Sequence, residues 1–131
     1  MSQPAAKAGD KVTGTDIHTV NVPDSSPQNL PHQFSGTLQS NLSANVEIVG
    51  KAAATLGSIA KNDSPHVPTS PGTSFVSPPS NQGKVNSGSE SVLINGKGAA
   101  RHSDSVNTCD DINPENSNGT IIAEGSVLIG N

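Results

Sequence analysis

A short hairpin unit recurs in this chain, and it limits the possible folds more than any other feature. Its clearest copy, residues 92–104, has the sequence Val-Leu-Ile-Asn-Gly-Lys-Gly-Ala-Ala-Arg-His-Ser-Asp. The branched apolar residues at its start favour a strand. Asn95-Gly96 supplies the two residues with positive φ that a type I′ turn requires. The segment therefore predicts a strand, a tight turn and a second short strand.

Two further copies of the unit are present, one of them divided between the chain ends. Residues 46–58 match the first copy at Val, Ile, Gly-Lys and Ala-Ala. Residues 127–131 (Val-Leu-Ile-Gly-Asn) supply the first half of a third copy, and residues 4–10 (Pro-Ala-Ala-Lys-Ala-Gly-Asp) supply the second half. The repeats predict a closed arrangement of three units in which the terminal strands lie side by side. Closure would also remove the exposed strand edges of an open sheet.

The rest of the chain is organised around these units. At 131 residues the length is typical of a single domain, residues 1–131. The predicted units span residues 36–58, 83–104, and 119–131 completed by 4–10. Proline-rich or polar connections separate them at residues 11–35, 59–82 and 105–118, with a short extended piece in the first around Ile17, Val20 and Val22. No segment has convincing helical periodicity. The expected fold is all-β, with three short hairpin repeats, pseudo-three-fold symmetry and long irregular loops.

The composition predicts a thin hydrophobic core. Hydrophobic residues make up 31% of the chain and aromatic residues 2%, without Trp or Tyr. A core of this kind needs an additional source of stability, such as a metal, a disulfide or assembly with a partner. The single cysteine excludes an internal disulfide, so a metal or a partner is favoured.

Charge and hydropathy exclude several classes of protein. The net charge is −4 and there is no basic run, which argues against nucleic acid as a partner. No apolar stretch approaches the roughly 20 residues of a membrane span. The N-terminus lacks the apolar core of a secretory signal, so we expect synthesis in the cytoplasm without a signal peptide.

The positions of histidine and cysteine predict a metal site. His18, His66 and Cys109 each follow the second strand of one unit, and the two histidines do so at the same interval. In a closed three-unit arrangement such positions converge on the axis. His32, in the first connection, can supply a fourth ligand. Three imidazoles and one thiolate suit a single structural Zn²⁺ ion, whose binding energy would stabilise the fold.

Other interpretations of these residues stay open. The histidines and the cysteine could be unrelated, since their spacing is not that of a compact zinc finger. His102 lies inside a repeat and is expected to be a repeat side chain rather than a ligand. Four aspartates near the loops could orient ligand histidines or could form turns; they are Asp16, Asp104, Asp110 and Asp111.

Two other functions compete with a structural role. The first is a hydrolase, using either a zinc site or Cys109 with His102 and Asp104 or Asp110. Proximity in sequence is no evidence for a catalytic triad, and the chain offers little core to support a pocket. We therefore expect no enzymatic activity. The second alternative is a free-standing, metal-stabilised adhesin or binding module.

With these residues laid out, the chain resembles the PAAR-repeat proteins over nearly its whole length. The three Pro-Ala-Ala-Arg-like copies are Pro-Ala-Ala-Lys, Ala-Ala-Ala-Thr and Gly-Ala-Ala-Arg, and the Gly-Asp that usually follows is kept only as Gly9-Asp10. Further matching segments are residues 30–36 (Leu-Pro-His-Gln-Phe-Ser-Gly), 64–68 (Ser-Pro-His-Val-Pro), 78–83 (Pro-Pro-Ser-Asn-Gln-Gly) and Thr108-Cys109. The replacement of Gly-Asp by Gly57-Ser58 and Ser103-Asp104 leaves the details of those turns open.

The resemblance implies a fold and a function. The fold would be a pointed β-cone that caps the trimeric, VgrG-like spike of a contractile injection machine. Such machines include type VI secretion systems, extracellular injection particles and phage tails. The zinc ligands carried over are His18, His32, His66 and Cys109. The protein would be a monomer on its own, would sit at the tip of the device, and would be ejected with it. It would touch the target membrane transiently, and secreted effectors are possible further partners.

Overall fold

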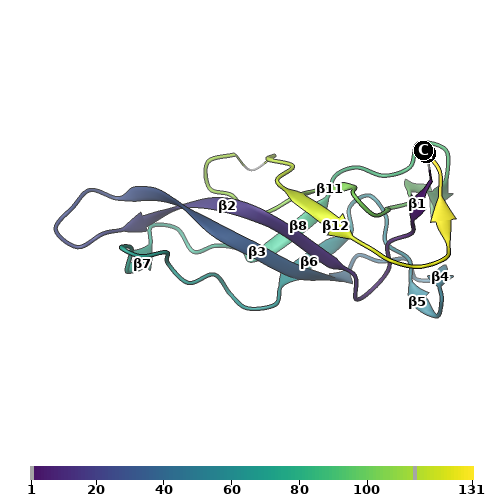
Figure 1. The fold of residues 1–131 in the computed structure, drawn as a ribbon, viewed down its shortest axis with the longest axis horizontal. Helices are drawn as coiled ribbons and strands as arrows, with labels where there is room; N and C mark the ends of the chain where they lie inside the picture. Colours follow the sequence, from purple (N-terminus) through teal and green to yellow (C-terminus); the bar gives the residue numbers. More distant parts are fainter. Residues whose placement is uncertain (1, 114) are drawn as a thin grey trace.

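Six antiparallel strands close into a ring in the computed structural model, which describes residues 2–113 and 115–131 (Figure 1). The strands are β2 (Lys11–Asn21), β3 (Gln28–Ser40), β6 (Ile59–Asn62), β8 (Gln82–Val85), β11 (Ser105–Asn107) and β12 (Gly119–Ile122). Neighbours pair in the order β2, β3, β6, β8, β11, β12, and β12 pairs with β2 to complete the ring. The described residues contain no helix, so the all-β, cone-like prediction is confirmed. Accordingly, no helix able to cross a membrane occurs among them.

Three two-stranded pairings lie beside this ring. They are β4 (Glu47–Ile48) with β5 (Lys51–Ala52), β9 (Leu93–Ile94) with β10 (Lys97–Gly98), and β13 (Leu128–Ile129) with β1 (Gln3–Pro4). The β1–β13 pair joins the two ends of the chain, as the split repeat predicts. Figure 1 shows β1, β4 and β5 at one end of the molecule, which we call the base.

The turns of the two continuous hairpins have the predicted backbone geometry. Asn95 and Gly96 have φ values of 54° and 79°. Val49 and Gly50 occupy the same positions in the other hairpin, with φ values of 52° and 78°. Both turns thus place two successive residues at positive φ, as a type I′ turn requires.

Three alanines connect the units through a cyclic set of backbone hydrogen bonds. The Ala6 N–H donates to Ala100 O at 2.9 Å, the Ala100 N–H to Ala54 O at 3.0 Å, and the Ala54 N–H to Ala6 O at 3.0 Å. All three residues are buried. The small side chain of alanine allows three backbones to approach this closely at one axis.

The turn after each alanine pair is built in the same way in all three copies. Gly9, Gly57 and Ser103 have φ values of 90°, 92° and 75°. A side-chain oxygen of the next residue accepts a backbone N–H from within the turn. These bonds are Lys7 N to Asp10 Oδ2 at 3.0 Å, Thr55 N to Ser58 Oγ at 2.9 Å, and Arg101 N to Asp104 Oδ2 at 2.7 Å. Serine therefore replaces glycine or aspartate here without loss of the turn.

The prediction that residues 11–35 form an irregular connection is wrong. They form β2 and most of β3, which pair from Lys11↔Thr37 to Val20↔Gln28 and extend beyond the ring. The short strand β7 (Ser74–Phe75) pairs with the far end of β2. The other two predicted connections also begin with ring strands, β6 and β11, and the residues after these are largely irregular.

Pro31 is accommodated within β3 because of its register. It lies opposite Ile17, whose N–H donates to Asp110 Oδ2 and whose carbonyl accepts from the Asp111 N–H. The polar backbone atoms of Ile17 thus point away from β3, so the pair is not a hydrogen-bonded one. The missing N–H of proline therefore removes no bond between β2 and β3.

Candidate metal centre

The long hairpin positions three polar side chains on the inner face of the sheet. Asp16 and His18 are two residues apart in β2, and side chains at that spacing point to the same side of a strand. His32 lies in β3, which pairs with β2. Asp16 and His18 are completely buried, and His32 is 4% exposed. Burial of three such groups requires that they interact with one another or with a ligand.

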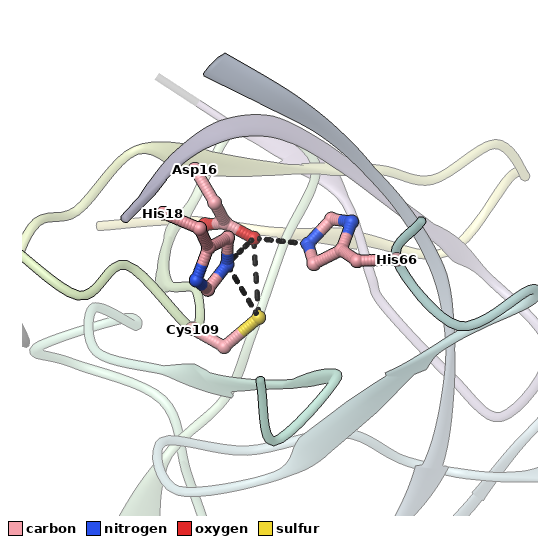
Figure 2. A group of neighbouring side chains, drawn as sticks. All are labelled: Asp16, His18, His66 and Cys109. Atoms are coloured by element: carbon pink, nitrogen blue, oxygen red, sulfur yellow. Dashed lines mark hydrogen bonds and ion pairs between the residues drawn. The ribbon is translucent and has the colours of Figure 1, made fainter. Parts of the chain in front are cut away.

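Loops complete the group from two other parts of the chain. His66 follows β6 and Cys109 follows β11. One ligand atom each of Asp16, His18, His66 and Cys109 lies within 4.8 Å of all the others (Figure 2). Carboxylate, imidazole and thiolate are all ligands of Zn²⁺ and related metals. The chemistry of this donor set fits a bound metal ion.

The distances within the group centre on one oxygen of Asp16. Asp16 Oδ2 lies 2.8 Å from His66 Nε2 and accepts a hydrogen bond from Cys109 Sγ at 3.2 Å. It is 3.8 Å from His18 Nε2. Cys109 Sγ in turn is 3.7 Å from His18 Nε2. The predicted convergence of the segments that follow the three units therefore occurs at this point.

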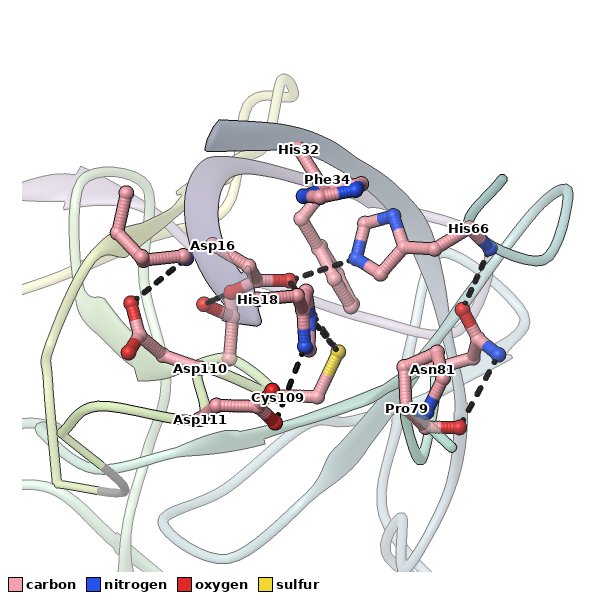
Figure 3. A network of polar contacts seen from close by, with 12 residues as sticks. Asp16, His18, His32, Phe34, His66, Pro79, Asn81, Cys109, Asp110 and Asp111 are labelled. Atoms are coloured by element: carbon pink, nitrogen blue, oxygen red, sulfur yellow. Dashed lines mark hydrogen bonds and ion pairs between the residues drawn. The ribbon is translucent and has the colours of Figure 1, made fainter. Parts of the chain in front are cut away.

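His32 adjoins the group, but its ring nitrogens contact backbone atoms. The centroid of its ring is 5.3 Å from that of His18 and 5.6 Å from that of His66 (Figure 3). Its Nδ1 is 2.9 Å from Leu30 O, and its Nε2 accepts a hydrogen bond from the Thr69 N–H at 3.0 Å. The role of His32 as a ligand stays a prediction.

The aspartates of the loop after β11 have separate roles. Asp111 Oδ1 lies 3.1 Å from His18 Nδ1, a buried nitrogen with no other partner in the described residues (Figure 3). A carboxylate in this position can fix the orientation of the imidazole. Asp110 accepts the backbone N–H groups of Ile17, Ile112 and Asn113, so it organises the loop.

The group also shifts the pKa values of its members. Burial raises the pKa of Asp16, but hydrogen bonds from His18, His66 and Thr108 outweigh burial and hold this pKa well below its usual range. Burial lowers the pKa of both histidines, but their contacts with Asp16 prevail and raise the values to about 10 for His18 and about 9 for His66. Burial likewise raises the pKa of Cys109, and the same histidines lower it overall. The shifts of Asp16 and of the two histidines thus all favour the charged forms of these side chains.

His102 is placed apart from this group. Its Nδ1 accepts a hydrogen bond from the Ala123 N–H at 3.1 Å. The hydrolase alternative pairs His102 with Cys109, but the cysteine sulfur instead contacts Asp16 and His18. That pairing therefore receives no support.

The sequence predicts Asp16 only as a supporting or turn residue. The structure places Asp16 within the group, where its Oδ2 is 2.8 Å from His66 Nε2, 3.2 Å from Cys109 Sγ and 3.8 Å from His18 Nε2. The signal that could have identified it is the spacing Asp16-x-His18, which is informative only once residues 11–21 are known to be a strand.

Comparison with known protein families supports the resemblance described above. A family profile described as the PAAR motif matches residues 77–131, which include Cys109 and the clearest hairpin unit. The match confirms the resemblance to the PAAR-repeat family, and the motif suggests a spike-tip protein of a contractile injection machine. A search of curated proteins found no match.

Proposed function

We propose that this protein is a zinc-stabilised tip that caps the trimeric, VgrG-like spike of a contractile injection machine. The observation that carries the proposal is the cyclic bonding of Ala6, Ala54 and Ala100. A single chain that repeats its backbone contacts three times about an axis can present one unit to each subunit of a three-fold partner. The PAAR motif in residues 77–131 points to the same class of protein.

The base offers a surface suited to such a partner. Val49 lies in the turn between β4 and β5, Leu93 in β9 and Leu128 in β13. These three side chains are 71%, 61% and 58% exposed. Exposed apolar side chains that form a contiguous patch are typical of interaction surfaces. Contact with the end of a spike would remove them from water and favour docking.

The opposite end of the molecule suits the leading point of the device. The hairpin of β2 and β3 extends away from the base and narrows, with β7 at its side (Figure 1). In this proposal the hairpin meets the target membrane transiently, the protein is ejected with the spike, and effectors travel with the assembly.

Zinc would secure the narrow part of the molecule. His18, His66 and Cys109 are predicted ligands that lie together, and Asp16 and His32 are the two candidates for the fourth position. A metal held by ligands from β2 and two loops would cross-link segments that have few apolar contacts. Its binding energy would then contribute directly to the stability of the fold.

The test is co-purification with the candidate spike trimer of the same gene cluster, imaged by electron microscopy. We expect wild type to bind as one chain per trimer, base first. The double variant Leu93→Glu, Leu128→Glu should lose binding at least tenfold, because it places two charges at the apolar contact.

Ile112→Glu is the matched control, since Ile112 is also exposed (56%) but lies in the loop after β11. It should bind like wild type. If wild type fails to bind the trimer, or if the base variant binds equally well, the capping function is contradicted. The free-standing binding module would then be the better explanation.

A further inference from the structure

We propose that Asp16, not His32, completes the metal site with His18, His66 and Cys109. In this arrangement His32 secures the residues around Thr69 instead of binding the ion. The inference rests on the proposed function only in that it assumes a bound zinc ion.

The position of the Asp16 carboxylate favours direct coordination. With metal–ligand distances of about 2.0–2.3 Å, tetrahedral ligand atoms lie roughly 3.3–3.6 Å apart. Asp16 Oδ2 is 2.8 Å from His66 Nε2, 3.2 Å from Cys109 Sγ and 3.8 Å from His18 Nε2. These separations bracket the tetrahedral range, so small adjustments around an ion would satisfy it.

The other Asp16 oxygen is already engaged, which leaves Oδ2 for the metal. Thr108 Oγ1 donates a hydrogen bond to Asp16 Oδ1. Ligating carboxylates are usually fixed by such a bond from outside the site. Asp111 Oδ1 lies 3.1 Å from His18 Nδ1 on the outer side of the ring, so that Nε2 faces the group.

His32 lacks a free lone pair in this geometry. Its Nδ1 is 2.9 Å from Leu30 O, and because a carbonyl oxygen only accepts, Nδ1 must carry the proton. Nε2 is then the only acceptor of the neutral ring, and the Thr69 N–H already occupies it at 3.0 Å. Coordination by His32 would require that this bond be broken.

His32 has a structural use that explains why it is buried without binding metal. Thr69 donates to His32 through its N–H and to Pro31 O through its hydroxyl group, at 2.7 Å. These two bonds attach the segment after His66 to β3. His32 therefore holds that segment, and with it His66, beside the metal site.

The direct test is X-ray absorption spectroscopy at the zinc edge of the wild-type, zinc-loaded protein, which needs no variant to fold. Outer-shell scattering counts the imidazoles bound to the ion. We expect one sulfur and two imidazoles, with a further oxygen donor. A spectrum with one sulfur and three imidazoles would overturn the proposal.

A pair of variants gives an independent readout, the zinc dissociation constant measured by competition with a chelator. Loss of an outer partner of a ligand costs about 10–100-fold in affinity, so Asp16→Asn should cost at least 100-fold. His32→Gln, whose amide can still donate to Leu30 and accept from Thr69, should change affinity less than tenfold. The reverse order of effects would assign the fourth position to His32.

Failure of this inference can be distinguished from failure of the proposed function. A three-imidazole spectrum with intact spike binding overturns only the assignment of Asp16. A wild-type chain that folds and stays metal-free in excess zinc overturns this inference and the zinc component of the proposed function together.

Discussion

At the scale of single residues, three alanines allow the backbones of the three repeat units to meet at the axis of the molecule. Ala6, Ala54 and Ala100 bond to one another in a cycle and are buried. A larger side chain at any of them would meet two neighbouring backbones. The equivalent position two residues later is different, because it holds Ala8 in one unit and Leu56 in another.

This difference predicts the outcome of two alanine-to-leucine variants. Ala54→Leu should lower the free energy of unfolding by about 1–3 kcal/mol or more, because overpacking at a tight site forces side chains and backbone to shift. Ala8→Leu reproduces the residue that the equivalent position tolerates, and should change stability by less than about 0.5 kcal/mol. Urea denaturation measures both values. Equal losses in the two variants would show that the axis is not especially crowded.

The sequence also predicted several individual residues of the candidate metal site. His18, His66 and Cys109 were predicted to converge from their positions after the repeated units, and the structure brings them together. Asp16 was not recognised as a member of the group, because a lone aspartate in a polar segment is usually a turn residue.

At the scale of elements, glycine and one phenylalanine explain how short strands close a ring. Three glycines of the ring strands each lie two residues before a buried apolar residue. They are Gly36 before Leu38 in β3, Gly83 before Val85 in β8 and Gly119 before Ile121 in β12. A Cβ on Gly36 would lie 2.7 Å from Lys61 O and 2.8 Å from Phe34 Cε1, and one on Gly83 would lie 3.3 Å from Phe34 Cζ. The phenyl ring of Phe34 therefore packs where Gly36 and Gly83 lack side chains.

Adding a methyl group at this position should weaken the ring. Gly36→Ala is expected to lower the free energy of unfolding by about 1–3 kcal/mol, since the clash involves backbone as well as a buried ring. Gly130→Ala is the control, because a Cβ there would meet nothing within 4 Å. Thermal and urea unfolding followed by circular dichroism would compare the two. A neutral Gly36→Ala variant would contradict the packing described here.

The sequence predicted some strands correctly and missed others. The hairpins near residues 46–52 and 92–98 have a strong local signal, which is a run of apolar residues followed by a turn that needs positive φ. Both hairpins are present in the structure. The strands β2 and β3 alternate between inward and outward side chains, but their inward positions include Asp16, His18 and His32. Because polar site residues occupy inward positions of these strands, the sequence lacks the alternation of apolar and polar residues by which strands are recognised.

At the scale of the whole molecule, a thin core and a buried charged group make stability dependent on both metal and pH. In the metal-free chain, the raised pKa values of His18 and His66 mean that protonated histidines stabilise the fold. This contribution is complete below pH 6.5, the unperturbed value, and is lost as the pH rises through about 9 to 10. Zinc has the opposite requirement, since it binds deprotonated imidazoles and thiolate.

The two requirements predict how the melting temperature depends on pH. The difference in melting temperature between zinc-loaded and metal-free protein should widen from about pH 6 to about pH 9, because protons compete less with the ion while the metal-free form loses its ion pairs. Differential scanning calorimetry with and without chelator measures this difference. The variant Cys109→Ser should show a smaller difference at every pH. A difference that narrows as the pH rises would argue against a metal in this group.

The pairing of β1 with β13 has a consequence for protein engineering. Because Gln3 lies opposite Ile129 and Pro4 opposite Leu128, a short linker can join the original ends without disturbing the sheet. New ends can then be opened in the exposed turn between β2 and β3, far from the base. Such a circular permutant would keep all three units, and it would allow a reporter or passenger domain to be attached at the narrow end while the base stays free.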